Sequence, residues 1–193
     1  MGNDDLFKKS KLQKETRKKA NIPMLDNILI LCEGEKTEPN YFNSIKRKYR
    51  LSNVKIEWLG SNTDTITQKA IEHRLDYSQI WCVFDRDSFN AQNFNRAFQM
   101  IAKYPNIYIA YSNESFELWY LLHFNYYDTE ISRKQYCKLL DNLLGTKYQK
   151  NSPKMYDLIC DKENIAIKNA KQLLNSYSTY NPEKIIPRQQ FSN

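Results

Sequence analysis

Two short segments of the sequence place acidic side chains directly after apolar runs. Glu33 follows the run ILILC at 28–32, and Asp85 and Asp87 follow a second apolar run at 79–84. In an extended segment, residues two apart project to the same side, so Asp85 and Asp87 could reach one cation together. Two carboxylates, with a third from a neighbouring strand, suit Mg²⁺ or Mn²⁺, which take their remaining ligands from water and substrate phosphates. We therefore predict a catalytic divalent-metal site at Glu33, Asp85 and Asp87, with phosphodiester hydrolysis as its chemistry.

In that chemistry Glu33 would position or deprotonate the attacking water. Acids at strand ends also occur as helix caps and surface charges, and an Asp-x-Asp pair alone is a weak signal. The order strand, Glu-Gly, strand, Asp-x-Asp favours the metal site over that alternative. The chain has only four glycines, which argues against a Walker-type phosphate loop and a GxGxxG fingerprint. A nucleoside triphosphate is therefore not expected as an obligatory cofactor.

Apolar runs typical of strands alternate with amphipathic stretches typical of helices between residues 25 and 125. We predict strands at 28–32, 54–59, 79–84 and 107–111, and helices at 38–49, 65–75, 91–103 and 114–124. This alternation indicates βαβ units and an α/β fold with a mainly parallel four-stranded sheet flanked by helices. In such a sheet the carboxyl ends of the strands lie at one edge, where Glu33 and Asp85 would meet. Gly34 is expected to let the chain turn sharply after Glu33, and Thr37 to cap the first helix.

The regions on either side of this α/β domain differ from it. Residues 1–24 are rich in lysine and arginine and predict a flexible basic arm, which contacts a nucleic acid or an ATPase partner or is simply a solvated tail. Residues 126–193 predict a small helical extension of the same domain. Its helices are expected at 132–144, 154–160 and 163–176, the first with a capping box from Ser132 to Gln135 and a stop at Gly145.

Composition narrows the class of protein. The 193 residues suffice for one main domain, and a formal net charge of +7 favours a polyanionic partner. The four cysteines form no CxxC pair, and Cys32 and Cys82 lie in apolar runs, as expected of reduced thiols in a cytoplasmic protein. Only two histidines are present, so zinc sites and histidine-based triads have few candidate residues. No stretch approaches the ~20 apolar residues of a membrane span, and no membrane partner is expected.

A third polar cluster follows the fourth strand, in the segment YSNESFELWYLLHF at 111–124. Asn113 and Glu117 are four residues apart and are expected to share a helix face near its N-terminus. There they could extend the metal shell, hold a phosphate, or act only as a cap and an ion-pair partner. Glu35 and Glu38 stand at a predicted helix start, where acids favour the macrodipole. The residues predicted to bind substrate are Lys36, Arg86, Asn113, Glu117 and His123, although Lys36 could be a solvated loop charge and Arg86 a structural ion-pair residue.

Three blocks of the sequence together resemble the RloB-like proteins, a family with a Toprim-type (Rossmann-like) fold that accompanies ATPases in bacterial phage-defence and restriction loci. The blocks are ILILCEGEKTEPNYF at 28–42, IWCVFDRDSF at 80–89 and SNESFELWYLLHF at 112–124. The resemblance spans about residues 25 to 180. The third block departs from the family, which more often has a proline and a cysteine where Glu114 and Ser115 stand. Asn181-Pro182-Glu183 keeps a turn typical of the family but is not followed by an obvious final helix.

The resemblance implies a Toprim domain with Glu33 as its glutamate and Asp85 and Asp87 as its DxD pair. Toprim proteins include topoisomerases, primases and nucleases, all of which use a divalent metal on a nucleic-acid backbone. The resemblance further implies a Mg²⁺- or Mn²⁺-dependent nuclease acting on RNA or DNA, the effector of an antiviral or abortive-infection system with an AAA- or ABC-type ATPase partner. The alternative is a non-catalytic nucleic-acid-binding or regulatory subunit of such a complex. Nucleotidyl transfer of the primase kind is a third possibility, and a homo-oligomer is compatible with all three.

Overall fold

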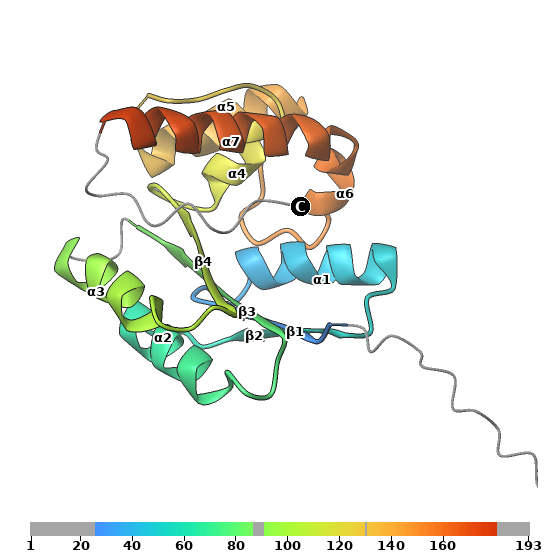
Figure 1. The fold of residues 1–193 in the computed structure, drawn as a ribbon. Helices are drawn as coiled ribbons and strands as arrows, with labels where there is room; N and C mark the ends of the chain where they lie inside the picture. The colour runs from blue at the N-terminus through green and yellow to red at the C-terminus, as the bar shows by residue number, and fades with distance from the viewer. Residues whose placement is uncertain (1–25, 87–90, 130, 181–193) are drawn as a thin grey trace, which may run out of the picture.

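Four parallel strands form the centre of the molecule. The computed structural model describes residues 26–86, 91–129 and 131–180, so the basic arm at 1–24, Asp87 and the turn at 181–183 lie outside the described residues. The strands are β1 (Ile28–Cys32), β2 (Val54–Trp58), β3 (Gln79–Asp85) and β4 (Ile107–Ser112). They pair in the order β2-β1-β3-β4, and every pairing is parallel (Figure 1). The predicted four-stranded α/β sheet is confirmed, and it is parallel throughout.

Helices cover both faces of this sheet (Figure 1). Those between the strands are α1 (Thr37–Tyr49), α2 (Thr63–Glu72) and α3 (Ala91–Ile101). After β4 come α4 (Glu117–Leu122), α5 (Arg133–Leu144), α6 (Met155–Ile159), the 3₁₀ turn η1 (Cys160–Lys162) and α7 (Glu163–Tyr180). Helices α2 and α3 lie on one face, whereas α1 and the later helices lie on the other.

The period-2 alternation of the strands explains the two layers. Leu29 and Leu31 of β1 are buried among the apolar residues of α2 and α3, while Cys32 faces the opposite side and packs with residues of α1 and α4. In β3, Val83 joins Cys32 on that second side. A strand buried on both faces needs apolar residues at nearly every position, which is why these runs read as continuously hydrophobic.

Helix α1 begins differently from the prediction. Lys36 occupies the N-cap position and makes no side-chain cap, whereas Thr37, the expected cap, is the first residue of the helix. The Thr37 hydroxyl instead donates to Oδ1 of Asn151 at 2.6 Å, and Asn40 donates to the Asn151 carbonyl at 2.8 Å. Thr37 is therefore used to join the start of α1 to the C-terminal region.

Helix α4 is shorter than the predicted helix at 114–124. Glu114, just before it, is bonded to α5 instead: its carboxylate accepts the Arg133 backbone N–H at 3.0 Å, and its own N–H donates to the Tyr136 hydroxyl at 3.3 Å. The Tyr136 hydroxyl also donates to the Asn113 carbonyl at 2.9 Å. Because these bonds hold the segment outside the helix, the expectation that Asn113 and Glu117 share a helix face was wrong.

Helices α4, α5 and α6 pack onto the sheet through one shared hydrophobic core, whereas α7 packs against α4 in a separate cluster. Cys32 and Val83 of the strands lie in the same buried cluster as Leu140 of α5 and Ile159 of α6. The predicted capping box of Ser132 and Gln135 is present, and Gly145 ends α5 in the left-handed conformation (φ 66°). The boundaries at residues 24 and 125 stay a prediction.

All four cysteines are free thiols. Cys32 and Cys82 are buried as expected, and burial raises the pKa of the Cys82 thiol to about 12, so neither nucleophilic nor metal-binding thiolate chemistry is favoured at that residue. Within the ranges that the structure describes, no helix has the length and apolar content to cross a bilayer.

Candidate functional site

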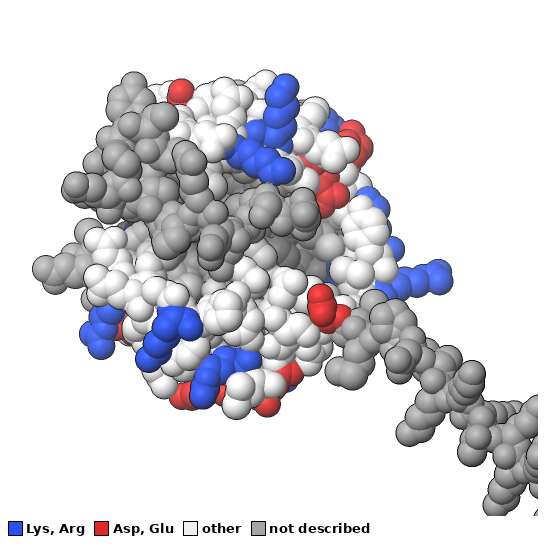
Figure 2. Space-filling view, viewed as in Figure 1, with Lys and Arg blue, Asp and Glu red and all other residues white. Residues whose placement is uncertain are grey.

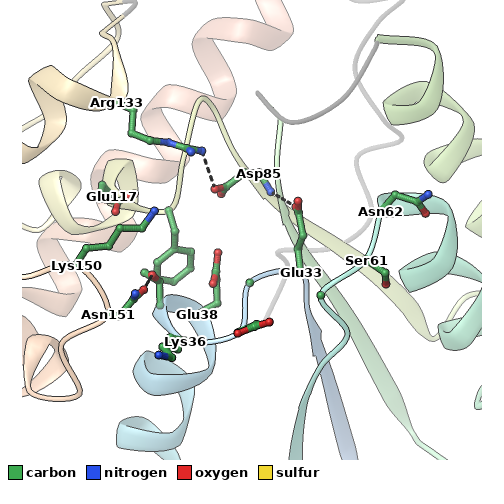
Figure 3. Close-up of a pocket in the computed structure, with 15 residues that line it drawn as sticks. Glu33, Lys36, Glu38, Ser61, Asn62, Asp85, Glu117, Arg133, Lys150 and Asn151 are labelled. Carbon is green, nitrogen blue, oxygen red and sulfur yellow. Dashed lines mark hydrogen bonds and ion pairs between the residues drawn. The ribbon is translucent and has the colours of Figure 1, made fainter.

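A polar crevice opens at the carboxyl edge of the sheet, with a volume of about 560 Å³. Its walls come from the β1–α1 loop, the β2–α2 loop, the end of β3, the start of α4 and two segments of the C-terminal region (Figure 3). The carboxylates that line it are Glu33, Glu35, Glu38, Asp85 and Glu117, and the cations are Lys36, Arg133 and Lys150. The crevice therefore lies where ligands bind in open α/β sheets.

Glu33 and Asp85 are held together at the centre of this crevice. The Asp85 backbone N–H donates to Oε2 of Glu33 at 3.1 Å, and the Glu33 N–H donates to the Val83 carbonyl at 2.9 Å (Figure 3). The ends of β1 and β3 thus fix the two carboxyl groups relative to each other. Two of the three predicted metal ligands are brought together, and the third, Asp87, lies outside the described residues. Residues 26–86, 91–129 and 131–180, which do not include Asp87, contain no cluster of three His, Cys, Asp or Glu side chains that could hold a metal ion.

Arg133 reaches into the crevice from the opposite side. Its Nη2 lies 3.6 Å from Oδ2 of Asp85, whose side chain is 16% exposed. Arg133 is the first residue of α5, and Glu114 holds its backbone N–H. Sequence reasoning missed this residue, because the capping box placed it at a helix start without indicating what that helix packs against.

Glu38 and Glu117 form a second acidic pair, deeper in the wall. Their exposed fractions are 5% and 2%, and the Tyr148 hydroxyl donates to Oε1 of Glu117 at 3.1 Å. No hydrogen-bond donor among the described residues reaches the buried Oε2 of Glu38. Burial raises the pKa of Glu38, and the negative charge of Glu117 raises it further. Glu38 was expected only to favour the helix dipole, and nothing in its sequence context signalled that its carboxyl group would be buried.

Gly34 lets the Glu38 carboxylate lie close against the loop. A Cβ at Gly34 would overlap Oε2 of Glu38, so any other residue would require the end of that side chain to shift. The glycines with positive φ are Gly60 and Gly145, and Gly34 is not among them. The chain bends at 33–36, as expected, and the bend needs no positive φ at Gly34; the close approach of the Glu38 carboxylate is an additional role.

The other predicted substrate-binding residues divide into two groups. Lys36 and Glu117 line the crevice, whereas Arg86, Asn113 and His123 do not. The Arg86 guanidinium lies 5.5 Å from the centre of the Phe94 ring, and its backbone N–H donates to the Ser112 carbonyl. His123 is fully buried, and its Nδ1 lies 2.9 Å from the Trp119 carbonyl oxygen. Burial lowers the pKa of His123, which favours the neutral ring of a packed core histidine.

The donor set fits a hard divalent cation. Glu33 and Asp85 offer carboxylate oxygens, the ligands that Mg²⁺ and Mn²⁺ prefer, in a crevice with room for water and a phosphate group. Arg133 and Lys150 supply positive charge on the wall opposite Glu33 (Figure 3). Such an arrangement can hold a phosphate between fixed cations and a carboxylate-bound metal.

Comparison with known proteins identifies the family. The chain matches the family model described as RloB-like protein over residues 28–192. No curated protein and no solved structure matches the chain closely. The matched region includes the strand ends that carry Glu33 and Asp85 and the α5 residue that pairs with Asp85. Because it covers most of the sequence, the chain belongs to the RloB-like protein family.

Proposed function

We propose that this protein is a Mg²⁺- or Mn²⁺-dependent nuclease that hydrolyses phosphodiester bonds of RNA or DNA in the crevice at the carboxyl edge of the sheet. The observation that carries the proposal is the pairing of Glu33 and Asp85 from neighbouring strand ends, joined by a hydrogen bond of 3.1 Å, opposite the cations Arg133 and Lys150. Carboxylates facing fixed cations are what a phosphodiester and its metal together require.

Each residue has a proposed task. Glu33 and Asp85, with Asp87, would hold the cation, which when bound polarises the phosphate and neutralises its charge. Arg133 and Lys150 would donate hydrogen bonds to the phosphate oxygens and orient the scissile bond. The Glu33 carboxylate would position the attacking water and accept its proton. Lys36, exposed at the mouth, would contact a phosphate farther along the strand.

The biological setting is proposed from family membership. We propose that the nuclease is the effector of an antiviral or abortive-infection system and acts in the cytoplasm with an AAA- or ABC-type ATPase. Co-expression of the chain with the ATPase encoded beside it, followed by purification through a tag on either protein, tests the partnership. Recovery of each protein without the other would contradict it.

One observation favours a second function, a non-catalytic nucleic-acid-binding or regulatory subunit. The Arg133 guanidinium already pairs with Asp85, at 3.6 Å from Oδ2, and the nuclease would need the same carboxylate as a ligand of the metal ion. If that ion pair persists with nucleic acid bound, the crevice could bind a phosphate without metal and without cleavage. The two functions differ in one respect: only the nuclease requires a divalent cation.

The experiment that separates them measures cleavage of plasmid DNA, total RNA and transfer RNA by the purified chain, with Mn²⁺ or with EDTA, in the presence and absence of the partner ATPase. Glu33→Gln is compared with Glu72→Gln, a matched substitution at an exposed position on α2. The nuclease proposal predicts metal-dependent cutting that Glu33→Gln abolishes and Glu72→Gln retains. Tight binding with no cutting under any of these conditions would overturn it in favour of the binding function.

A further inference from the structure

A large aromatic side chain is exposed beside the crevice. Trp58 is the last residue of β2, and its side chain is 53% exposed. The other exposed large apolar side chains in the described part of the chain are Tyr49, Leu75, Leu158, Ile165, Ile167 and Leu174, none of which ends a strand. An exposed indole leaves a large apolar area in contact with water, which is unfavourable in the free protein. A partner that covers the ring would bury that area and gain binding free energy.

Strand register places Trp58 on the crevice side of the sheet. Trp58 pairs in register with Cys32, which in turn pairs with Val83, and in-register residues of parallel strands share a face. Cys32 and Val83 both belong to the core beneath α1. Asp85 is two residues beyond Val83 and two strands away from β2. With strand spacings of ~4.8 Å and rises of ~3.3 Å, the Trp58 and Asp85 backbones are separated by roughly 12 Å.

Local contacts bring the indole next to the crevice lining. A Cβ built at Gly60, which lines the crevice, would lie 3.6 Å and 3.9 Å from carbons of the Trp58 ring. The same point is 3.8 Å from Oε1 of Glu35. The ring therefore stands beside Gly60 at the end of the crevice formed by the β2–α2 loop.

The charges of the crevice decide what can lie on this ring. Its cations Arg133 and Lys150 come from the C-terminal region and Lys36 comes from the β1–α1 loop, whereas the β2–α2 loop contributes only uncharged residues, Gly60, Ser61 and Asn62. Glu35, beside the ring, would repel a phosphate. If one phosphate of a nucleic-acid strand lies near Arg133, the part of the strand near Trp58 is therefore expected to be a sugar and base rather than another phosphate. Figure 2 shows that the lysine and arginine side chains on the face it draws are scattered rather than gathered into one continuous patch.

We infer that Trp58 stacks on an unpaired base of the nucleic-acid strand whose phosphate lies in the crevice, so that the substrate class is single-stranded nucleic acid or an unpaired region within a folded one. This inference rests on the proposed function. A base in a duplex is already stacked and paired, so only an unpaired base can cover the indole without the cost of extrusion. A separation of roughly 12 Å corresponds to about three or four stacked nucleotides at ~3.4 Å each, and to fewer in an extended strand.

The test measures binding rather than cleavage, so that it does not depend on catalysis. The full chain carrying Asp85→Asn is titrated into four fluorescein-labelled probes of about 12 residues: an oligouridine, an oligothymidine, a duplex, and an abasic oligomer with the same backbone. This length exceeds the ~4 nucleotides of the smallest single-strand binding sites. Trp58→Ala, Trp58→Leu and Trp58→Phe are each compared in that background. Tyr49→Ala is the matched control, because Tyr49 is similarly exposed (51%) but ends α1, roughly 18 Å along the helix from its start at the crevice.

We expect Trp58→Ala and Trp58→Leu to weaken binding of the single strands roughly 5- to 150-fold, the equivalent of ~1–3 kcal/mol per stacked base. Trp58→Phe should weaken single-strand binding by much less, and Tyr49→Ala should leave it unchanged. No Trp58 variant should change binding of the abasic oligomer, which has no base to stack on the ring. Single-strand binding that is equally tight with and without Trp58 would overturn this inference and leave the nuclease proposal standing. Failure of every variant and the parent to bind any nucleic acid would overturn both.

Discussion

The Arg133 guanidinium lies 3.6 Å from the Asp85 carboxylate, so an ion pair joins the first residue of α5 to the last residue of β3. The two residues are far apart in sequence, and one belongs to the sheet while the other belongs to the helices added after it. Asn151, from the same C-terminal region, binds Thr37 at the start of α1. The C-terminal region therefore completes one wall of the crevice and supplies two of its cations, Arg133 and Lys150.

Replacing Arg133 should affect substrate binding more than folding. Arg133→Gln removes one phosphate contact, and the slope of log affinity against log salt for a single strand should become shallower by about 0.7. The matched substitution Arg96→Gln, at an exposed arginine of α3, should leave that slope unchanged. Filter binding or anisotropy at several salt concentrations measures both. Equal slopes for the native chain and Arg133→Gln would remove Arg133 from the binding site.

Glu38 should destabilise the protein at neutral and alkaline pH. Because burial and then Glu117 raise its pKa above the ordinary value of 4.5, the folded state binds the proton more tightly than the unfolded state does. The contribution of Glu38 to stability is therefore complete below pH 4.5 and is lost as the pH rises through the raised pKa. Glu38→Gln should increase the free energy of unfolding at pH 8 by about 1–3 kcal/mol and have little effect near pH 4.

Urea unfolding at a series of pH values measures that difference. Glu35→Gln serves as the control, because Glu35 lies in the loop just before α1, three residues from Glu38, with an exposed side chain. A Glu38→Gln variant that is less stable than the native chain at pH 8 would indicate that the carboxylate is ionised and held by a bound cation.

Gly34 and Glu38 should be energetically coupled. Gly34→Ala places a methyl group where Oε2 of Glu38 lies and should destabilise the fold. In a Glu38→Ala background the same methyl group has space, so the destabilisation should largely disappear. A double-mutant cycle with a coupling free energy of at least ~1 kcal/mol is expected. Additive effects would mean that another part of the loop restricts residue 34.

Tyr148 should stabilise the fold through Glu117. Its hydroxyl donates to the nearly inaccessible Oε1 of Glu117 at 3.1 Å, and burial and the neighbouring charge keep the pKa of Tyr148 well above its usual value. Tyr148→Phe leaves a buried carboxylate without this donor and should lower the free energy of unfolding by about 1–3 kcal/mol. Tyr104→Phe is the comparison, since the Tyr104 ring packs with Arg74 and Lys103 on the other side of the sheet. Equal stability of the two variants would contradict the assigned role.

The sequence predicted most of the fold because local patterns carry it. The apolar run at 28–32 coincides with β1, and the alternation of strands and helices was enough to predict a parallel sheet. The same topology required Glu33 and Asp85 to approach each other, and they do. These are consequences of periodicity and of the shared direction of parallel strands.

The remaining parts of the crevice depend on tertiary contacts that no local pattern encodes. Arg133 and Lys150 reach it only because α5 and the segment after it fold back over α1 and α4. The predicted helix at 114–124 was too long because Glu114 bonds to α5, and this cost the expected pairing of Asn113 with Glu117. His123 was selected as a polar residue near the cluster, but its side chain packs inward against Trp119.

The central claim is a carboxylate-dependent, metal-dependent nuclease, and the most direct measurement is the rate of Mn²⁺-dependent cleavage by Asp85→Asn relative to Asp76→Asn. Asp76 is an exposed aspartate just before β3, at the opposite edge of the sheet, where it pairs with His73. We predict that Asp85→Asn lowers the rate by at least about 100-fold, the scale of losing one transition-state contact, that Asp76→Asn leaves it unchanged, and that EDTA abolishes cleavage by the native chain. Equal cleavage by the two variants, or no cleavage of DNA, RNA or transfer RNA by the native chain with Mn²⁺ and the proposed ATPase partner, would contradict a nuclease function.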